Sequence, residues 1–392
     1  MTATAATAAT RFVRDRATWY AWLLSGGYLF LVNVQGNVVP FLQEQFDLSY
    51  RDVSLHSSAI AVGTILVGLF GERVTGRLGR KRSLWVGVGG LSGGGLLLCL
   101  SPVPAASIFS CFLIGFFGTL IPAILPALLA DIHGRRRTEA YAGQAIVSYC
   151  FGLSAPVVMG FFLWQGLGWR ATVVLGAAYI LGVGLWFRGT AIPEPAPAAA
   201  HGKRRLSAAF WAFWALLVAC CALEYCVLFW APAFLERVAG FDPASAATAA
   251  AAFPLGMLIG RIALGGLVRR VAARNLFFAA LTVTFFGFVV YWGIGNATAA
   301  VAGLFLLGLG IAALYPLSTT FAIGAAAGAE DVASVRLAVG FGISLLLAPM
   351  ALGALADDFG LGPAHLVLPA LILVSYLCFF VADALQKRVA RI

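Results

Sequence analysis

Twelve segments of this chain are long and apolar enough to cross a lipid bilayer, and they fall into two sets of six. A helix needs about 20 apolar residues to span the hydrocarbon layer. At 61% hydrophobic and 11% charged residues, the 392-residue chain has more apolar surface than a water-soluble fold could bury. We therefore expect an all-α membrane protein with twelve transmembrane helices. The expected spans are residues 17–42, 52–72, 83–101, 105–130, 139–164, 171–188, 208–235, 244–268, 275–293, 298–323, 334–356 and 364–386.

The second set of spans repeats parts of the first about 193 residues later. The repeated segments and residues are Phe112-Leu113-Ile114-Gly115 with Phe305-Leu306-Leu307-Gly308, Pro156 and Gly160 with Pro349 and Gly353, and Arg77 and Lys81 with Arg270 and Arg274. Many carriers consist of two such related bundles, which rock about a site between them. We expect an N-terminal six-helix bundle at residues 17–188 and a C-terminal six-helix bundle at residues 207–392.

Two further segments have the composition of tethers. Residues 189–206 are rich in Pro and Ala and lie where the repeats meet, so we expect a linker there. Residues 1–16 begin with an Ala/Thr tract that has no apolar core or cleavage site, which predicts a disordered N-terminus and no signal peptide.

The positive charges predict how the chain is oriented. Lys and Arg residues crowd both ends and the even-numbered connections, and few lie in the odd-numbered ones. By the positive-inside rule, both termini and the linker are cytoplasmic in a multi-pass protein of the cell (inner) membrane. The net charge of +10 then reflects topology and affinity for anionic lipid head groups, and we expect no nucleic-acid partner. The seven cysteines show no metal-ligand spacing, and we expect no metal and no cofactor.

A loop motif resembles one known superfamily. Gly76-Arg77-Leu78-Gly79-Arg80-Lys81 is similar to the end of the cytoplasmic loop signature of the major facilitator superfamily, with Gly76 in place of that signature's Asp. The resemblance implies two pseudo-symmetric six-helix bundles and alternating access. It also implies a cytoplasmic gate in which arginines such as Arg77, Arg80 and Arg270 need acidic partners, and Asp131 is the best remaining partner for Arg77. Alternatively, these arginines only enforce topology.

Shorter patterns are similar to the fucose, galactose and glucose permease-like branch. They are Glu224 with Trp230 and Pro232, Gly260-Arg261, Gly310 with Tyr315-Pro316, and Pro40-Phe41-Leu42. This resemblance implies proton-coupled uptake of a small hydroxylated solute. The chain departs from it in having no carboxylate in the 17–42 segment, where Asn33, Gln35 and Asn37 stand instead. Gly152, Pro156 and Gly160 resemble the superfamily's Gly/Pro motif, for which helix packing is a sufficient explanation.

Glu224 is the main candidate for proton coupling. It lies about fifteen residues into the 208–235 segment, which places it roughly 22 Å from the cytoplasmic end of a helix and near the bilayer centre. Ionisable groups there are costly and therefore need a reason. Loss of water favours the neutral form of a carboxyl, which suits a group that loads and releases a proton in each cycle. Direct contact with the solute, or a structural role, are the alternatives.

Arg261 is the second charged candidate within an expected span. A guanidinium stays charged and binds carboxylates through two parallel hydrogen bonds. Its Gly-Arg setting resembles the substrate-binding arginine of some organic-anion and nitrate carriers of the superfamily, and that resemblance implies an anionic solute. A salt bridge to Glu224 and a structural arginine that reaches toward the membrane surface are the competing interpretations.

Polar and aromatic residues complete the predicted binding site. Residues four apart share a helix face, which pairs Asn33 with Asn37, Gln144 with Ser148, and Tyr315 with Thr319. These faces indicate a hydrated cavity, although each pair could instead make hydrogen bonds between helices. Four aromatic residues could stack on a sugar or aromatic solute, or anchor helix ends at the membrane surface: Tyr149, Tyr225, Trp230 and Trp292.

The sequence therefore predicts a secondary active transporter that moves a small sugar-like or anionic organic solute by alternating access, coupled to protons. The alternative is proton-driven efflux of drugs or hydrophobic compounds, which would tolerate loss of the polar groups. We expect no enzyme, because the spans hold no His/Asp/Glu cluster and no nucleotide motif. The expected partners are the solute, protons and membrane lipids, with the protein as a monomer.

Overall fold

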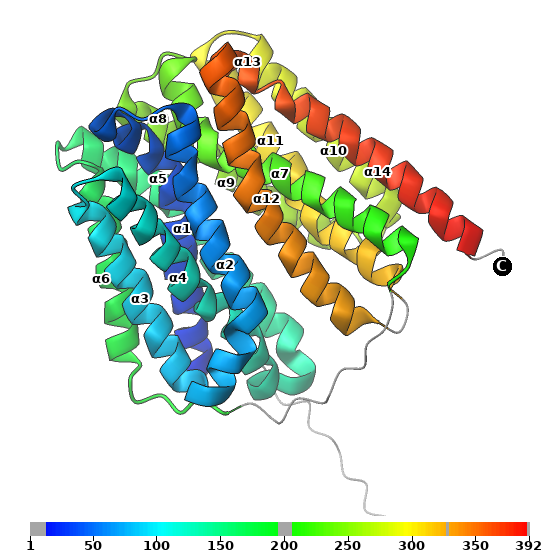
Figure 1. Ribbon diagram of the computed structural model, residues 1–392. Helices are drawn as coiled ribbons and strands as arrows, with labels where there is room; N and C mark the ends of the chain where they lie inside the picture. The colour runs from blue at the N-terminus through cyan, green and yellow to red at the C-terminus, as the bar shows by residue number, and fades with distance from the viewer. Residues whose placement is uncertain (1–12, 195–205, 327–328, 390–392) are drawn as a thin grey trace, which may run out of the picture.

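The computed structural model describes residues 13–194, 206–326 and 329–389, and these ranges are helical without strands (Figure 1). Residues 1–12 of the expected disordered N-terminus and residues 195–205 of the expected linker lie outside them. The N-terminal helices are α1 (Arg16–Phe46), α2 (Tyr50–Leu78), α3 (Arg80–Leu100), α4 (Pro104–His133), α5 (Arg137–Trp164) and α6 (Trp169–Trp186). The C-terminal helices are α7 (Ala208–Arg237), α8 (Pro243–Ala249), α9 (Ala252–Leu267), α10 (Ala273–Gly293), α11 (Ala297–Gly324), α12 (Glu330–Phe359), α13 (Leu361–Ala364) and α14 (Val367–Val389).

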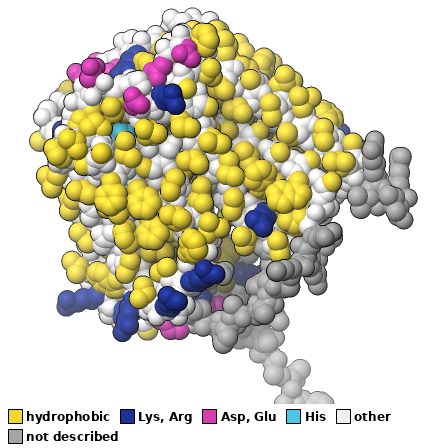
Figure 2. Space-filling model, in the orientation of Figure 1, with side chains coloured by type: hydrophobic (Ala, Val, Ile, Leu, Met, Phe, Trp, Pro, Cys, Tyr) yellow, Lys and Arg dark blue, Asp and Glu magenta, His cyan; other side chains and the backbone are white. Residues whose placement is uncertain are grey.

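These helices form the expected set of membrane spans. Within the described ranges, eleven spans are long and apolar enough to cross a membrane, and they count α8 with α9 and α13 with α14 as single spans. The 31-residue α1 is the twelfth long segment, and Asn33, Gln35 and Asn37 interrupt its apolar sequence. Figure 2 shows a broad apolar band between two more polar edges, as expected for a surface that faces lipid tails.

The span expected at 244–268 is broken into α8 and α9. Pro254 has no N–H to donate to Ala250, so the backbone turns tighter there, and Phe253 N donates to Ala250 O at 3.2 Å. Most of the remaining helices extend past the apolar segments by up to two turns, as α2 does by ending at Leu78, whereas α6 ends two residues early, at Trp186.

The 193-residue repeat reflects the same helix contact made twice. In the first half Gly63 of α2 lies against the carbonyl of Phe112 in α4, and in the second half Gly256 of α9 lies against the carbonyl of Phe305 in α11. A side chain on either glycine would collide with that backbone. Small residues let helix backbones approach closely in membranes, so the repeated sequence preserves one packing geometry in both bundles.

The two halves are joined closely at one end of the molecule. The linker end is the end at which α6 finishes and residues 189–194 follow, and the far end is the opposite end, with α8 and α13 (Figure 1). At the far end, the Asp357 carboxylate of α12 accepts hydrogen bonds from the backbone N–H groups of Tyr50 and Arg51 at 2.7 and 2.9 Å. Arg237 of α7 donates to Gln43 Oε1 of α1 at 2.8 Å. These contacts tie the two halves together at the far end.

Two glycines related by the repeat also lie at the far-end contact. Gly160 of α5 packs on α8, with Ala244 O 2.7 Å from where a β-carbon would sit. Gly353 of α12 packs on the start of α2, with Tyr50 O 2.6 Å from the equivalent position. The Gly/Pro motif of α5 and its repeat in α12 therefore serve close packing between the halves.

At the linker end the ion pairs stay within one half, among the residues that the structure describes. Arg80 Nη1 lies 2.6 Å from Asp131 Oδ2 and also donates to the carbonyl of Pro193 at 2.9 Å. The expected pairing of Asp131 with Arg77 is therefore wrong: Arg80 points inward and is buried, whereas Arg77 is exposed. Arg270 is exposed too, and the neighbouring Arg274 pairs with Asp383 at 3.4 Å.

Replacing Arg80 by Ala is expected to destabilise the protein by about 1.5–3 kcal/mol, because hydrogen bonds to a charged group are lost from a buried position. The midpoint of thermal unfolding in detergent should fall by several degrees. Arg82→Ala is the matched control, since Arg82 is exposed, and it should change little. Equal midpoints for the two variants would show that the Arg80 contacts contribute nothing to stability.

Candidate functional site

A cavity of about 350 Å³ lies between the two halves, near the middle of the long helices. Its polar lining from the first half comprises Tyr28, Asn33, Gln35, Thr64 and Tyr149, on α1, α2 and α5. Its polar lining from the second half comprises Glu224, Tyr225, Arg261 and Tyr315, on α7, α9 and α11. Apolar and aromatic side chains make up the rest. A space of this size between two bundles suits a small organic molecule.

A close approach of two helices borders the cavity. Gly36 of α1 touches the backbone carbonyl of Leu228 in α7, and both residues line the cavity. A β-carbon at Gly36 would collide with that carbonyl, so glycine is required for α1 and α7 to meet there. On the far-end side of this contact lies a small hollow of about 10 Å³, lined in part by Asn37 and Pro156.

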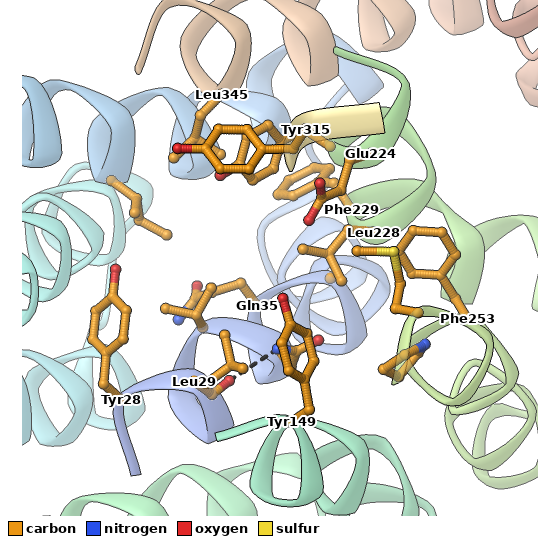
Figure 3. Close-up of a pocket in the computed structure, with 18 of the residues that line it drawn as sticks. Tyr28, Leu29, Gln35, Tyr149, Glu224, Leu228, Phe229, Phe253, Tyr315 and Leu345 are labelled. Carbon is orange, nitrogen blue, oxygen red and sulfur yellow. Dashed lines mark hydrogen bonds between the residues drawn. The ribbon is translucent and has the colours of Figure 1, made fainter. Parts of the chain in front are cut away.

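Glu224 provides the only carboxylate in the cavity lining. Figure 3 shows its carboxylate pointing into the same space as the hydroxyl groups of Tyr28 and Tyr149. Among the described residues, no hydrogen-bond donor or cation lies within bonding distance of it. Its ionisable neighbours are Arg261, Cys221 and the tyrosines at 149, 225 and 315. Arg261 attracts the carboxylate electrostatically from beyond ion-pair distance. Glu224 is thus a half-buried acid whose oxygens face open space.

Arg261 carries the only positive charge in the cavity lining. Its guanidinium carbon lies 4.5 Å from the ring centroid of Tyr149, which is a cation–π contact between the two halves. Its Nε–H is buried and has no acceptor. The repeat does not duplicate these charges, because the residue 193 positions before Arg261 is Gly68. The first half therefore contributes aromatic and amide groups, and the second half contributes both charges.

Six of the residues predicted from sequence line this cavity. They are Asn33, Tyr149, Glu224, Tyr225, Arg261 and Tyr315. The Asn33 amide donates to Leu29 O at 2.9 Å within its own helix, which is the bond drawn in Figure 3. This leaves the Asn33 side-chain oxygen as an acceptor.

The other predicted binding residues lie outside this cavity. Gln144 and Ser148 both donate to the Ser25 hydroxyl of α1, at 3.1 and 2.7 Å, so their shared face ties α5 to α1. Trp230 is fully buried and donates to Pro349 O at 3.0 Å. Asn37 lies in the small hollow, and Thr319 is one turn beyond Tyr315 and outside the lining. For Gln144, Ser148 and Trp230, the structure shows hydrogen bonds between helices.

The structure adds several residues to the candidate site. Tyr28, Gln35 and Thr64 supply polar atoms, and Phe253 and Phe341 supply apolar walls. Tyr28 lies five residues before Asn33, so its spacing from Asn33 along the helix is only a weak sequence signal that both face the cavity. No sequence signal identifies Phe253 and Phe341, because an aromatic residue in an apolar span is as often packed against a neighbouring helix. Within the described residues, no group of three His, Cys, Asp or Glu side chains could hold a metal ion.

Comparison with known proteins identifies the family. The family model described as Major Facilitator Superfamily matches residues 21–335, which is most of the chain. An uncharacterised MFS-type transporter of Yersinia pestis is 23% identical over 333 residues, covering 82% of this chain and 84% of that one. An ascochitine biosynthesis cluster MFS transporter of Didymella fabae is 31% identical over 142 residues, which cover 32% of this chain and 25% of that protein. A sugar transporter ERD6-like 8 of Arabidopsis thaliana is 25% identical, over 46% of this chain and 39% of that protein.

Solved structures share the fold over nearly the whole chain. A bacterial homologue of the human lysosomal transporter Spinster, in an inward-facing and unoccupied conformation, gives a TM-score of 0.72 at 15% identity and covers 97% of this chain and 98% of that one. The nucleoside transporter NupG gives a TM-score of 0.75 at 12% identity, with 94% and 99% covered. At such identities the likeness concerns the fold alone. It confirms the expected all-α architecture of two six-helix bundles.

Proposed function

The chain belongs to the major facilitator superfamily and is an integral multi-pass membrane transporter, and from this membership we propose that it moves a small organic solute by proton-coupled alternating access. The observation that carries the proposal is the Glu224 carboxylate, which lies without a hydrogen-bond or ion-pair partner among the described residues, in a cavity between two halves that meet at one end. A site between repeats is where alternating access exposes a solute to each side in turn.

Glu224 suits the role of proton carrier because of its surroundings. A carboxylate within a membrane span is costly unless it is neutralised or solvated. In this cavity a proton from water, or attraction to Arg261, can lower that cost. When the cavity opens to the other side, the proton can be released. The proton and the solute thereby bind in the same cavity, so the conformational change that moves one also moves the other.

The far end, where the halves are tied together, supports an inward-facing state. Lys and Arg residues gather along the lower edge of Figure 2, where the linker end lies, and the positive-inside rule makes that edge cytoplasmic. The termini and the linker would then be cytoplasmic, in a cell inner membrane. Because the far-end contacts close the cavity from the outside, the described conformation would open toward the cytoplasm. The Spinster homologue is inward-facing as well.

Replacing Asp357 by Asn is expected to shift the protein toward the outward-open state. The carboxylate caps the first turn of α2 across the two halves, and such caps contribute about 0.5–2 kcal/mol. The ratio of the two states should shift by between about twofold and about thirtyfold. Spin-label distances across the far end would report it, with Asp358→Asn as the matched control on the next, exposed residue. An unchanged distance distribution would show that the Asp357 cap does not hold the end closed.

Efflux of hydrophobic compounds is the second candidate, and the apolar share of the cavity wall favours it. Phe229, Phe253, Met257 and Phe341 would accept a lipophilic molecule without polar contacts. A carrier of polar solutes should instead depend on Asn33, Gln35 and Arg261.

Uptake into proteoliposomes separates the two functions. Purified protein is reconstituted, a pH gradient is imposed, and a panel of sugars, organic anions and one lipophilic dye is offered. The proposal expects a polar solute to accumulate with the proton gradient and to stop when a protonophore collapses it. Movement of the dye alone would support efflux, and movement of no solute under any gradient would contradict proton-coupled transport.

A further inference from the structure

The charge on Arg261 has no protein counter-ion within bonding distance. The guanidinium is permanently positive and lies inside the span formed by α8 and α9. Among the described residues no carboxylate lies within 4.0 Å of it, and its buried Nε–H has no acceptor. An unpaired charge at such depth is costly, which favours binding of an anion beside Arg261.

The geometry restricts what that partner can be. The Tyr149 ring covers one face of the guanidinium, and a stacked arginine keeps the N–H donors of its planar edge for other groups. Arg261 lines the cavity, so a bound solute can reach this edge. A carboxylate matches this edge, through two parallel charge-assisted hydrogen bonds.

Glu224 is the one internal competitor for this position. It lines the same cavity and is attracted by Arg261, yet no ion pair forms between them. The other ionisable groups facing Glu224 are Cys221, Tyr149, Tyr225 and Tyr315, all of which are neutral in their protonated forms. The cavity thus holds one fixed positive charge and one negative charge that a proton can remove.

Resting on the proposed function, we propose that the transported solute is a small organic anion with one carboxylate, which binds Arg261 while Glu224 carries the proton. A bound anion neutralises Arg261, and the proton neutralises Glu224. The loaded cavity then has a net charge of zero, because its only charges are those of Arg261 and the bound anion. Without solute, Glu224 in its charged form balances Arg261. In both forms the halves rock about a cavity of zero net charge, which avoids the cost of moving a bare charge through the membrane. The aromatic walls and the amides hold the remainder of the solute.

Transport of one anion with one proton moves no net charge. The rate should therefore follow a pH gradient and ignore the membrane potential. A neutral solute carried with a proton would respond to both. This difference separates the anion proposal from proton-coupled transport in general.

The first test measures binding to the purified protein by calorimetry, with two matched pairs of probes: benzoate against benzamide, and gluconate against glucose. In at least one pair the acid should bind about tenfold tighter than its neutral partner, as expected for a charge-assisted bidentate contact. Arg261→Gln should abolish that preference, and Arg261→Lys should restore part of it. Arg269→Gln is the matched control, because Arg269 is exposed at the end of α9 and should keep the wild-type preference. Thermal unfolding of each variant shows that it is folded.

Two results would overturn the anion proposal: no preference for the acid in either pair, or an undiminished preference in Arg261→Gln.

The second test measures proton-driven uptake in proteoliposomes while valinomycin and potassium set the membrane potential. Uptake of an acid that is unaffected by the potential supports the proposal. Proton-driven uptake of glucose that rises with an inside-negative potential would refute the anion class and leave the carrier function standing. Absence of proton-driven uptake for every probe would refute the carrier function itself.

Discussion

Replacing Glu224 by Gln is expected to abolish accumulation of the solute against its gradient and to leave exchange of solute across the membrane. Gln has nearly the same shape and takes up no proton, so the loaded carrier can still exchange solute, whereas the empty carrier keeps the unbalanced charge of Arg261 and returns poorly. A gradient of one pH unit stores about 1.4 kcal/mol per proton, which supports about tenfold accumulation in the wild type. In the variant the ratio of internal to external solute should fall to about one.

The matched control for this prediction is Glu236→Gln, in the same helix but at the far end and outside the cavity lining. It should accumulate solute as the wild type does. Counterflow in both variants shows that the protein is folded and inserted. If the Glu224 variant still accumulates solute tenfold under the same gradient, another group carries the proton and Glu224 has a structural role.

Replacing Gly160 or Gly353 by Leu is expected to slow transport by about five- to 150-fold, because a side chain has no room where the halves meet and overpacking costs about 1–3 kcal/mol. The far end could then not close fully, and the outward-open state would be favoured. Two measurements check this: the exchange rate in proteoliposomes, and the distance between spin labels at Glu44→Cys and Asp358→Cys, two exposed far-end positions. The distance should lengthen in both glycine variants.

Gly182→Leu is the matched control for the glycine variants. Gly182 is an exposed glycine of α6 with nothing within 4 Å of an added β-carbon, so its replacement should leave rate and distance unchanged. The two test glycines are related by the repeat and should give similar effects. Normal transport in both would mean that the close contact at the far end does not take part in the transport cycle.

Much of the fold follows from sequence because two strong physical constraints act on it. A membrane span requires a long apolar segment, and a duplicated packing contact requires glycine at the same place in each half, as at Gly63 and Gly256. Helix ends are less predictable, since polar turns continue past the hydrocarbon layer, as in the last turns of α2. Pro254 predicts the break before α9 only if it is known to lie in the interior of the span, because proline is tolerated in the first turn of a helix.

The candidate site is only partly visible in sequence. Glu224 and Arg261 stand out because charged residues are rare in apolar spans, and both line the cavity. Gln144 and Ser148 have an equally good pattern, yet their face turns toward Ser25, because helix rotation is set by packing that a single segment does not encode. In the same way, Asp131 pairs with Arg80 and not with Arg77 because the packing of the helix ends points Arg80 inward.

The most direct test of proton-coupled transport measures the protons themselves. Lightly buffered proteoliposomes without an imposed pH gradient are given a solute from the uptake panel, and the external pH is followed. The account predicts that solute entry makes the external medium more alkaline, by one proton per solute molecule, and that Glu224→Gln abolishes this change. Solute entry at the normal rate with no movement of protons would contradict the account.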